Sequence, residues 1–219
     1  MEYSQPVRVH VWGERACFTR PEMKVERVSY PVMTPSAARG VLEAIYWKPE
    51  FTWQVRSIEV LKPIRYFSML RNEVKALASY RVREPMTIET TRAQRHTLGL
   101  RDVAYVINAD VIVKPGVDED PAKYRDQFRR RVEKGRCFHR PYLGCREFGA
   151  YFARPSVAER PIDLNEPLGL MLLDMEFADK PPHMPRFFNA KLENGCLHVP
   201  EYDFNRKGEE PRVDATARG

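Results

Sequence analysis

The residues best suited to chemistry lie in two stretches, one around residue 46 and one between residues 120 and 149. The second stretch reads DPAKYRDQFRRRVEKGRCFHRPYLGCREFG, and between Pro121 and Arg146 it holds nine Lys or Arg residues against two acidic ones. Like charges at this density repel one another, so their concentration favours a polyanionic partner. A solvated helix face is the plainer interpretation of a charge run alone. Because aromatic residues and glycines stand among the arginines, we favour nucleic acid, whose bases stack on rings and whose phosphates accept from amides.

The candidate RNA-binding residues share a positive charge or, at one position, a permissive backbone. They are Lys48, Arg92, Arg95, Arg129, Arg130, Arg131, Arg136, Arg140, Gly144 and Arg146. Gly144 belongs to this set because a glycine turn lets an RNA backbone come close and its amides can donate to phosphate. A simple bend between two elements is an equal alternative for Gly144.

Proton transfer at neutral pH is typical of histidine. His139, in the loop after the basic run, is the best placed imidazole, although a histidine that satisfies loop backbone is as good an interpretation. The four cysteines include no CxxC pair, and Cys137 and Cys145 are eight positions apart, which matches no common zinc site. We therefore expect no metal and no cofactor.

The overall composition sets outer limits on the function. A net charge of +6 and a pI of about 9.2 favour an anionic partner, and 43% hydrophobic residues allow a sizeable core. The N-terminus lacks the pattern of a signal peptide, and no apolar window is long enough to cross a membrane. These features predict a cytoplasmic protein that does not contact membranes.

Two helices must position the candidate residues. The first is predicted from Pro35 to about Trp47, with Thr34 as its N-cap, and the second from Pro121 to Lys134, with Asp120 as its N-cap. In the second helix, apolar residues recur every four positions and form a narrow packing stripe. These residues are Tyr124, Phe128 and Val132.

Alternating apolar residues predict strands at 7–12, 51–60, 102–113 and 147–153, with a basic hairpin or loop over 68–101. A continuation of the second strand to residue 66, after a bend at Pro63, is an alternative. With the two helices, this order predicts an α+β fold, a ferredoxin-like, RNA-recognition-motif-like domain with an inserted hairpin over residues 1–157. Beyond it, a strand at 168–177 and a hairpin around Asn194-Gly195 predict a small antiparallel C-terminal β-sheet within residues 158–219, which end in a tail.

Four stretches, EAIYWKP, DVAYVINADV, PAKYRDQFRRRVEKGRCFHRPYLGCREF and LENG, are similar to the CRISPR-associated Cas-five family, in its subtype I-C branch. The resemblance spans residues 6 to 200. It implies an RNA-recognition-like N-terminal domain and a small C-terminal sheet. It also implies a subunit that cleaves the repeat hairpin of precursor CRISPR RNA without metal, leaves a 2′,3′-cyclic phosphate, and stays on the 5′ handle in the interference complex.

The resemblance further implies catalytic residues: a tyrosine in the first helix and a Lys-His pair that opens the second. Tyr46 matches the tyrosine and Lys123 the lysine, but Tyr124 stands where the histidine would be. Tyrosine, with a pKa of about 10, is a poor base at neutral pH, and Tyr124 also belongs to the packing stripe. His139 is the candidate for the missing imidazole.

Three hypotheses remain open from the sequence. The first is the endoribonuclease, whose partners are precursor CRISPR RNA and the backbone and large subunits of the complex. The second is a non-catalytic scaffold that only binds the 5′ handle. The third adds non-specific binding of duplex DNA through Arg129, Arg130 and Arg131.

Overall fold

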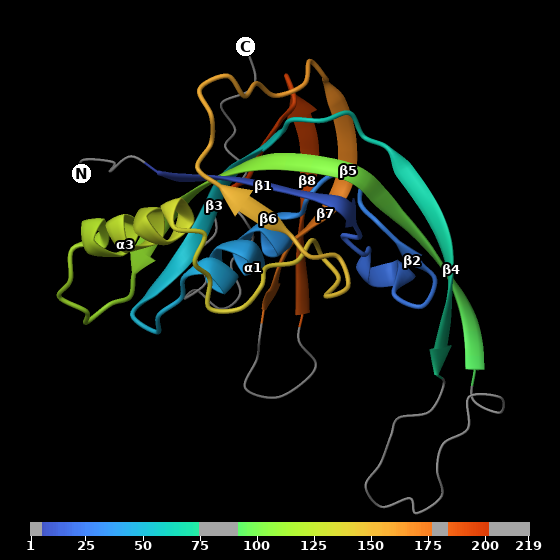
Figure 1. Cartoon of the computed structure of the whole chain (residues 1–219), viewed down its shortest axis with the longest axis horizontal. Coiled ribbons are helices and arrows are strands. Elements are labelled where there is room, and N and C mark those ends of the chain that lie inside the picture. Colours follow the sequence, from blue (N-terminus) through green and yellow to red (C-terminus); the bar gives the residue numbers. More distant parts are fainter. Residues whose placement is uncertain (1–5, 75–91, 177–183, 202–219) are drawn as a thin grey trace, which may run out of the picture.

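The computed structural model describes residues 6–74, 92–176 and 184–201. Its strands and helices share one layered arrangement, in which a strongly curved sheet carries the helices on its concave side (Figure 1). The elements are β1 (Val7–Ala16), η1 (Pro21–Met23), β2 (Arg27–Val28), α1 (Pro35–Ile45), β3 (Phe51–Val60), β4 (Tyr66–Val74), β5 (Arg92–Val113), α3 (Pro121–Glu133), β6 (Tyr151–Ala153), β7 (Glu166–Glu176), β8 (Met184–Glu193) and β9 (Cys196–His198).

Within the described residues, nine strands form one sheet in the order β6-β1-β5-β3-β9-β8-β7, with β2 and β4 paired to β5 beside this path. Paired strands are antiparallel except for β2 and β5. The α+β class is therefore confirmed, as a mostly antiparallel half-barrel with two α-helices in the described part of the chain. The predicted C-terminal strands are antiparallel too, and they continue the same sheet because β9 pairs with β3.

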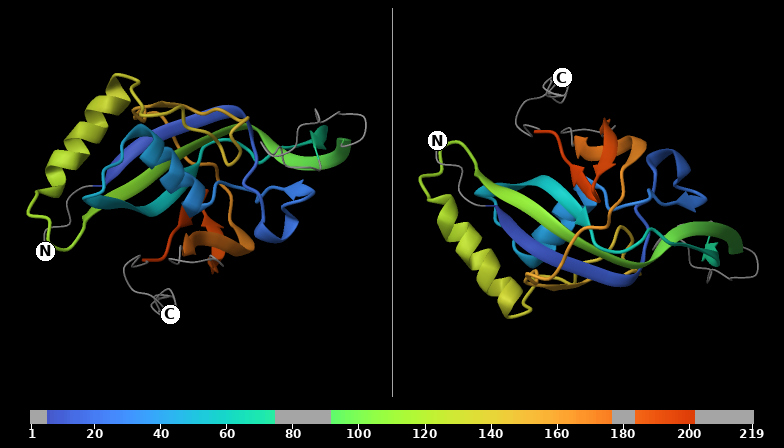
Figure 2. Two further views of the ribbon diagram at one scale, coloured as in Figure 1. Left: turned by 90° about the horizontal axis from the view of Figure 1, so that it is seen from below. Right: turned by 90° about the horizontal axis from the view of Figure 1, so that it is seen from above.

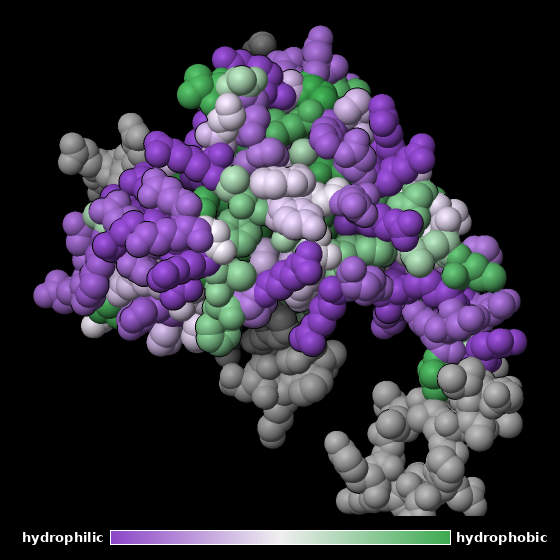
Figure 3. Space-filling model, viewed as in Figure 1, coloured by the Kyte–Doolittle hydropathy of each residue, from purple (hydrophilic) through white to green (hydrophobic). Residues whose placement is uncertain are grey.

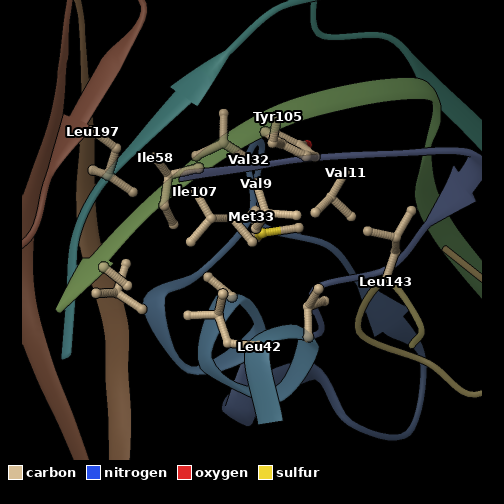
Figure 4. Close-up of a cluster of buried hydrophobic side chains, with 14 of the residues drawn as sticks. Val9, Val11, Val32, Met33, Leu42, Ile58, Tyr105, Ile107, Leu143 and Leu197 are labelled. Atoms are coloured by element: carbon tan, nitrogen blue, oxygen red, sulfur yellow. The ribbon is translucent and has the colours of Figure 1, made fainter. Parts of the chain in front are cut away.

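The core lies between the sheet and α1. In β1 every second side chain from Val7 to Val11 is fully buried, as the alternation in the sequence predicts. Leu42 of α1 meets Val9 and Ile107 from the sheet side, so helix and sheet close on one apolar layer (Figure 4). On α3, Tyr124, Phe128 and Val132 are the buried residues, which confirms the predicted packing stripe.

Several boundaries differ from the prediction. β1 runs past residue 12 to Ala16, and β6 begins at Tyr151 rather than at residue 147. The first helix ends at Ile45 rather than near Trp47, and Tyr46 is its C-cap in an extended conformation. β3 stops at Val60 instead of continuing to residue 66, because Pro63 cannot donate to a strand ladder.

The predicted basic hairpin is a two-stranded arm formed by β4 and the first half of β5, paired from Tyr66–Leu100 to Val74–Arg92. The rest of that hairpin, residues 75–91, lies outside the described residues. β5 runs on from the arm into the central sheet, and Asp102, with φ 52°, marks the passage between the two. The arm and α3 lie at opposite ends of the molecule (Figures 1 and 2).

Candidate nucleic-acid interface and active site

Tyr46 stands where α1 ends. Its N–H still donates to the Leu42 carbonyl at 2.8 Å, and its own carbonyl accepts from the Trp53 indole at 2.9 Å. Its ring lies 5.6 Å from the ring of Phe51, and the residue is only 6% exposed. Tyr46 is thus fixed by both backbone and ring contacts, with little freedom to move.

Arg131 of α3 fastens the two helices together at this point. Its Nη1 donates to the carbonyl of Ile45 at 3.0 Å, and its guanidinium lies 5.1 Å from the centre of the Tyr46 ring. A cation at the carbonyl end of a helix is favourable for the helix dipole. Arg131, predicted to bind RNA, is therefore half-buried and already engaged within the protein.

The start of α3 brings the other predicted catalytic residues to the same place. Asp120 caps the helix by accepting from the Ala122 N–H at 2.8 Å. Tyr124 is buried with its ring 4.8 Å from Phe51, so the Phe51 ring contacts both tyrosines. Lys123 is exposed, and its Nζ lies 2.7 Å from the carboxylate of Glu119. The structure therefore brings Tyr46 and Tyr124 together on Phe51, with Lys123 close enough to act on both tyrosines.

The charges at this cluster act on one another. Burial raises the pKa of Tyr46, and the neighbouring Tyr124 and Glu50 raise it further, against Arg131 and Lys123. Burial and Glu50 likewise raise the pKa of Tyr124. The hydrogen bond to Glu119 raises the pKa of Lys123. At neutral pH both tyrosines keep their protons and Lys123 keeps its charge, so all three are donors and none is a base.

The loop after α3 is pinned to the last turn of α1. The backbone N–H groups of Phe138 and His139 both donate to the Ala44 carbonyl, at 2.8 and 3.3 Å. The Phe138 side chain is 84% exposed, and the exposed His139 ring has its Nδ1 3.3 Å from the Arg140 carbonyl. The structure therefore brings His139 to the end of the helix that carries Tyr46.

Exposed rings and cations lie in the segments next to the buried tyrosines. Trp47 directly follows Tyr46 and is 56% exposed, and Lys48 beside it is exposed as well. We call the exposed residues at this place the helix-end surface; its members are Trp47, Lys48, Lys123, Phe138 and His139. Exposed aromatic rings beside lysines are suited to bases and phosphates of a single strand.

The remaining predicted arginines of α3 lie on its outer surface, where hydrophilic residues gather (Figure 3). Arg129 and Arg130 are exposed, and each has a contact 3.4 Å long to Asp126. Arg129 also borders an open hollow of about 450 Å³ with Arg8 and Arg154. Arg8 and Arg154 were not among the sequence candidates, because only the fold brings them beside α3.

The turn at Gly144 packs against the protein itself. Gly144 has φ +83°, and a Cβ there would lie 2.0 Å from the Cys17 carbonyl oxygen. This close approach alone explains why position 144 needs a glycine, and no RNA contact is required. It therefore favours the simple-bend alternative. Arg146 is exposed beside it, and Arg140 lies with its guanidinium 5.7 Å from the Tyr151 ring centre.

Arg92 and Arg95 lie on the arm, apart from the helix-end surface (Figure 1). Arg95 is 3.7 Å from the Glu26 carboxylate, which also accepts a hydrogen bond from the His96 N–H. If these arginines contact RNA, they contact a different part of it from Tyr46 and Lys123. Arg136, exposed in the loop after α3, lies closer to the cluster, since its N–H donates to the Arg131 carbonyl at 2.9 Å.

Comparison with known proteins decides the family. The model of the family described as "CRISPR-associated protein (Cas_Cas5)" matches residues 7–200. The chain belongs to the Cas5 family. It is 46% identical over 211 residues to the "CRISPR pre-crRNA endoribonuclease Cas5d" of Thermus thermophilus, covering 89% of this chain and 91% of the relative. It is also 46% identical over 216 residues to the protein of the same name from Mannheimia succiniciproducens, covering 90% and 95%.

Solved structures agree with the fold of a Cas5 protein. A structure described as a CRISPR-associated protein is 25% identical with a TM-score of 0.67, covering 90% of this chain and 93% of the other. The crystal structure of SMU1763c from Streptococcus mutans is 22% identical with a TM-score of 0.66 and the same coverage. The second likeness, at this identity, concerns the fold alone.

One residue of this Cas5 chain that the sequence prediction missed is Glu50. It is half-buried, and its charge acts on both Tyr46 and Tyr124. The available signal was its place four residues after Tyr46, at the start of a strand. A side chain there points back toward the helix end only if the chain turns at Pro49, which the sequence does not determine alone.

Two general features concern only the described part of this Cas5 chain. No group of three or more His, Cys, Asp or Glu side chains is placed so that it could hold a metal ion. None of the helices found there is both long and apolar enough to cross a membrane.

Proposed function

We propose that this Cas5 chain is the endoribonuclease that processes precursor CRISPR RNA and remains bound to the 5′ handle of the product. The observation that carries the proposal is the interaction of Lys123 with Tyr46 and Tyr124, whose rings both contact Phe51. Exposed Trp47 follows Tyr46, and the exposed residues Phe138 and His139 are bonded through their backbones to the last turn of the same helix. The names of the two relatives that are 46% identical support the same activity.

The reaction is an attack of a ribose 2′-hydroxyl on the adjacent phosphate, which leaves a 2′,3′-cyclic phosphate and a 5′-hydroxyl. Negative charge grows on the phosphoryl oxygens, and the ammonium of Lys123 is placed to stabilise it. The protonated hydroxyls of Tyr46 and Tyr124 are suited to donate hydrogen bonds to the same oxygens. His139, exposed at the end of α1, is suited to give the leaving oxygen its proton.

A non-catalytic scaffold is the second candidate, and Tyr124 is the observation that favours it. This residue takes the place of the histidine implied by the family resemblance, and it is buried with a raised pKa. On this alternative the exposed cations hold the 5′ handle without cutting. Binding of duplex DNA through exposed Arg129 and Arg130 is compatible with either candidate.

Incubation of the purified protein with its cognate repeat RNA in EDTA separates the two functions. The endoribonuclease gives one cleavage product with a cyclic phosphate end, and RNA with a 2′-deoxyribose at the scissile nucleotide stays intact. Lys123→Ala and Tyr46→Phe should slow cleavage by at least about 100-fold, whereas Arg129→Ala mainly weakens binding. Tightly bound but uncut RNA would refute the endoribonuclease and leave the scaffold.

The finer architecture and the setting belong to the same proposal. We infer a ferredoxin-like plan, supported by the strand order β6-β1-β5-β3 with α1 and α3 as the connecting helices. The division at residue 157 places β1 to β6 in the RNA-binding part and β7 to β9 in the C-terminal part. The backbone and large subunits of a CRISPR complex in the cytoplasm are the partners that this function requires.

A further inference from the structure

Glu50 is held at the meeting point of three elements. It lies between the end of α1 and the first residue of β3, and its backbone carbonyl accepts from the Lys114 N–H, just after β5, at 2.9 Å. The next residue, Phe51, is the one whose ring contacts both Tyr46 and Tyr124. The backbone of Glu50 is therefore fixed beside the tyrosine cluster.

One oxygen of the Glu50 carboxylate accepts no hydrogen bond from the described residues. This oxygen, Oε2, is buried. Buried polar atoms are nearly always paired, and a carboxylate oxygen without a donor is costly. An unpaired acceptor close to Tyr46 and Tyr124 indicates a place for a donor that the bound RNA supplies.

Among the described groups around the Glu50 carboxylate, none other is free to accept a proton. Its charge acts on Tyr46, at the end of α1, and on Tyr124, in the first turn of α3. Lys123 and Glu119 act on Tyr124 in turn. The two tyrosines and the lysine hold their protons. Glu119 is engaged with Lys123 at 2.7 Å, whereas Glu50 Oε2 has no such partner.

We propose that Glu50 accepts the proton of the attacking 2′-hydroxyl; this rests on the endoribonuclease function proposed above. As the O–H bond breaks, its proton passes to the carboxylate and its electron pair forms the bond from the 2′ oxygen to phosphorus. The bond from phosphorus to the 5′ oxygen then breaks, and that oxygen takes a proton from His139 or water. Lys123 stabilises the charge on the phosphoryl oxygens throughout.

Single-turnover cleavage of the cognate repeat RNA in EDTA, with protein in excess, tests the rate. Glu50→Gln keeps the shape and removes the base, so we expect a loss of about 100-fold or more. Glu50→Asp keeps the charge but withdraws it by one methylene, so its rate should be intermediate. Glu193→Gln, a matched change in the exposed end of β8, should cleave like the wild type. Cleavage by Glu50→Gln within threefold of the wild-type rate would overturn the proposal.

Binding tests the contact itself, independently of cleavage. The wild type should bind repeat RNA with a ribose at the scissile nucleotide several-fold more tightly than the same RNA with a 2′-deoxyribose there, and Glu50→Gln should lose that preference. An unchanged preference would mean that Glu50 acts only through the tyrosines, and would overturn the proposal. If the wild type does not cut, the endoribonuclease function fails, while the ribose preference still decides whether Glu50 meets the 2′-hydroxyl. Equal thermal unfolding of the variants shows that each comparison concerns folded protein.

Discussion

Arg131 is expected to stabilise the fold rather than to bind RNA. Replacing it by methionine tests this, because the change in stability and the change in RNA binding can be measured separately. The sequence placed Arg131 with Arg130 in one RNA-binding face. The structure instead directs Arg131 to the Ile45 carbonyl and the Tyr46 ring, while Arg130 stays exposed on the outer side of α3. Arg131→Met keeps the length of the stem and removes only the guanidinium, and Arg130→Met is its neighbouring control.

The magnitude follows from the contacts of Arg131. A hydrogen bond from a charged group contributes about 1.5–3 kcal/mol, and a partly exposed cation–π contact about 0.5–1 kcal/mol. Against this, the buried Nε of Arg131 has no partner in the described residues, and leaving such a donor unpaired costs about 1 kcal/mol or more. The expected net loss in free energy of unfolding is about 1–3 kcal/mol, against about 0.5 kcal/mol or less for Arg130→Met.

Two measurements on the same pair of variants decide the matter. Each kcal/mol shifts the melting temperature of a chain of this size by about 2–4 °C, so Arg131→Met should melt about 2–12 °C below the wild type and Arg130→Met close to it. In RNA binding, loss of a phosphate contact lowers the salt slope by about 0.7–1, and we expect this for Arg130→Met only. Equal melting temperatures together with a reduced salt slope for Arg131→Met would refute the structural role.

Three further outcomes follow from single residues elsewhere in the fold. Gly144→Ala should lower the free energy of unfolding by more than about 2 kcal/mol in urea titrations, because Ala adopts φ +83° poorly and its Cβ meets the Cys17 carbonyl; unchanged stability would contradict this. The Cys17 thiol, with a nearby arginine, lowers the pKa of Cys145 to about 6, so alkylation of Cys145 by iodoacetamide should rise with pH around 6, whereas a rise only above pH 8 would show an ordinary thiol. Burial raises the pKa of Asp174 above its usual value despite the nearby Arg39. The protonated carboxyl therefore stabilises the fold fully below the unfolded pKa of about 3.9, and this stability is lost as the pH rises through the higher pKa of the folded state. Urea unfolding between pH 3.5 and 7 should show that loss in the wild type and not in Asp174→Asn, and parallel curves would contradict it.

Local patterns in the sequence were enough for most elements. The caps Thr34 and Asp120 and the four-residue spacing of Tyr124, Phe128 and Val132 correctly predicted two helices, because caps and packing stripes are set by neighbours in the chain. The Asn194-Gly195 pair correctly predicted the turn between β8 and β9 for the same reason. These local patterns do not show which strands pair when they lie far apart in the sequence. The pairing of β9 with β3, which joins the C-terminal strands to the sheet, was therefore not predicted.

The site shows the same limit. Tyr46 and Lys123 were expected to meet, and the structure brings them together, but that expectation came from the family resemblance and not from their spacing. Arg131 and Gly144 could not be assigned correctly from residue type alone, because their partners are backbone carbonyls, which every residue has. Glu50 was missed because an acidic residue in a basic interface is read as a solvated charge unless its burial is known.

The partner of each cation decides whether it is available to RNA. Lys123 is tied to Glu119 by an exposed ion pair, and such pairs contribute about 0–1 kcal/mol, so a phosphate can replace the carboxylate at little cost. The pair nevertheless keeps the ammonium charged and close to Tyr46 before RNA arrives. Arg131 is half-buried on a helix carbonyl, so its release would unpair groups that water does not reach. The same basic helix therefore supplies an exposed charge for the phosphate at its start, Lys123, and a half-buried charge that holds Tyr46 near its end, Arg131. The surroundings of these two residues, rather than their types, decide the two roles.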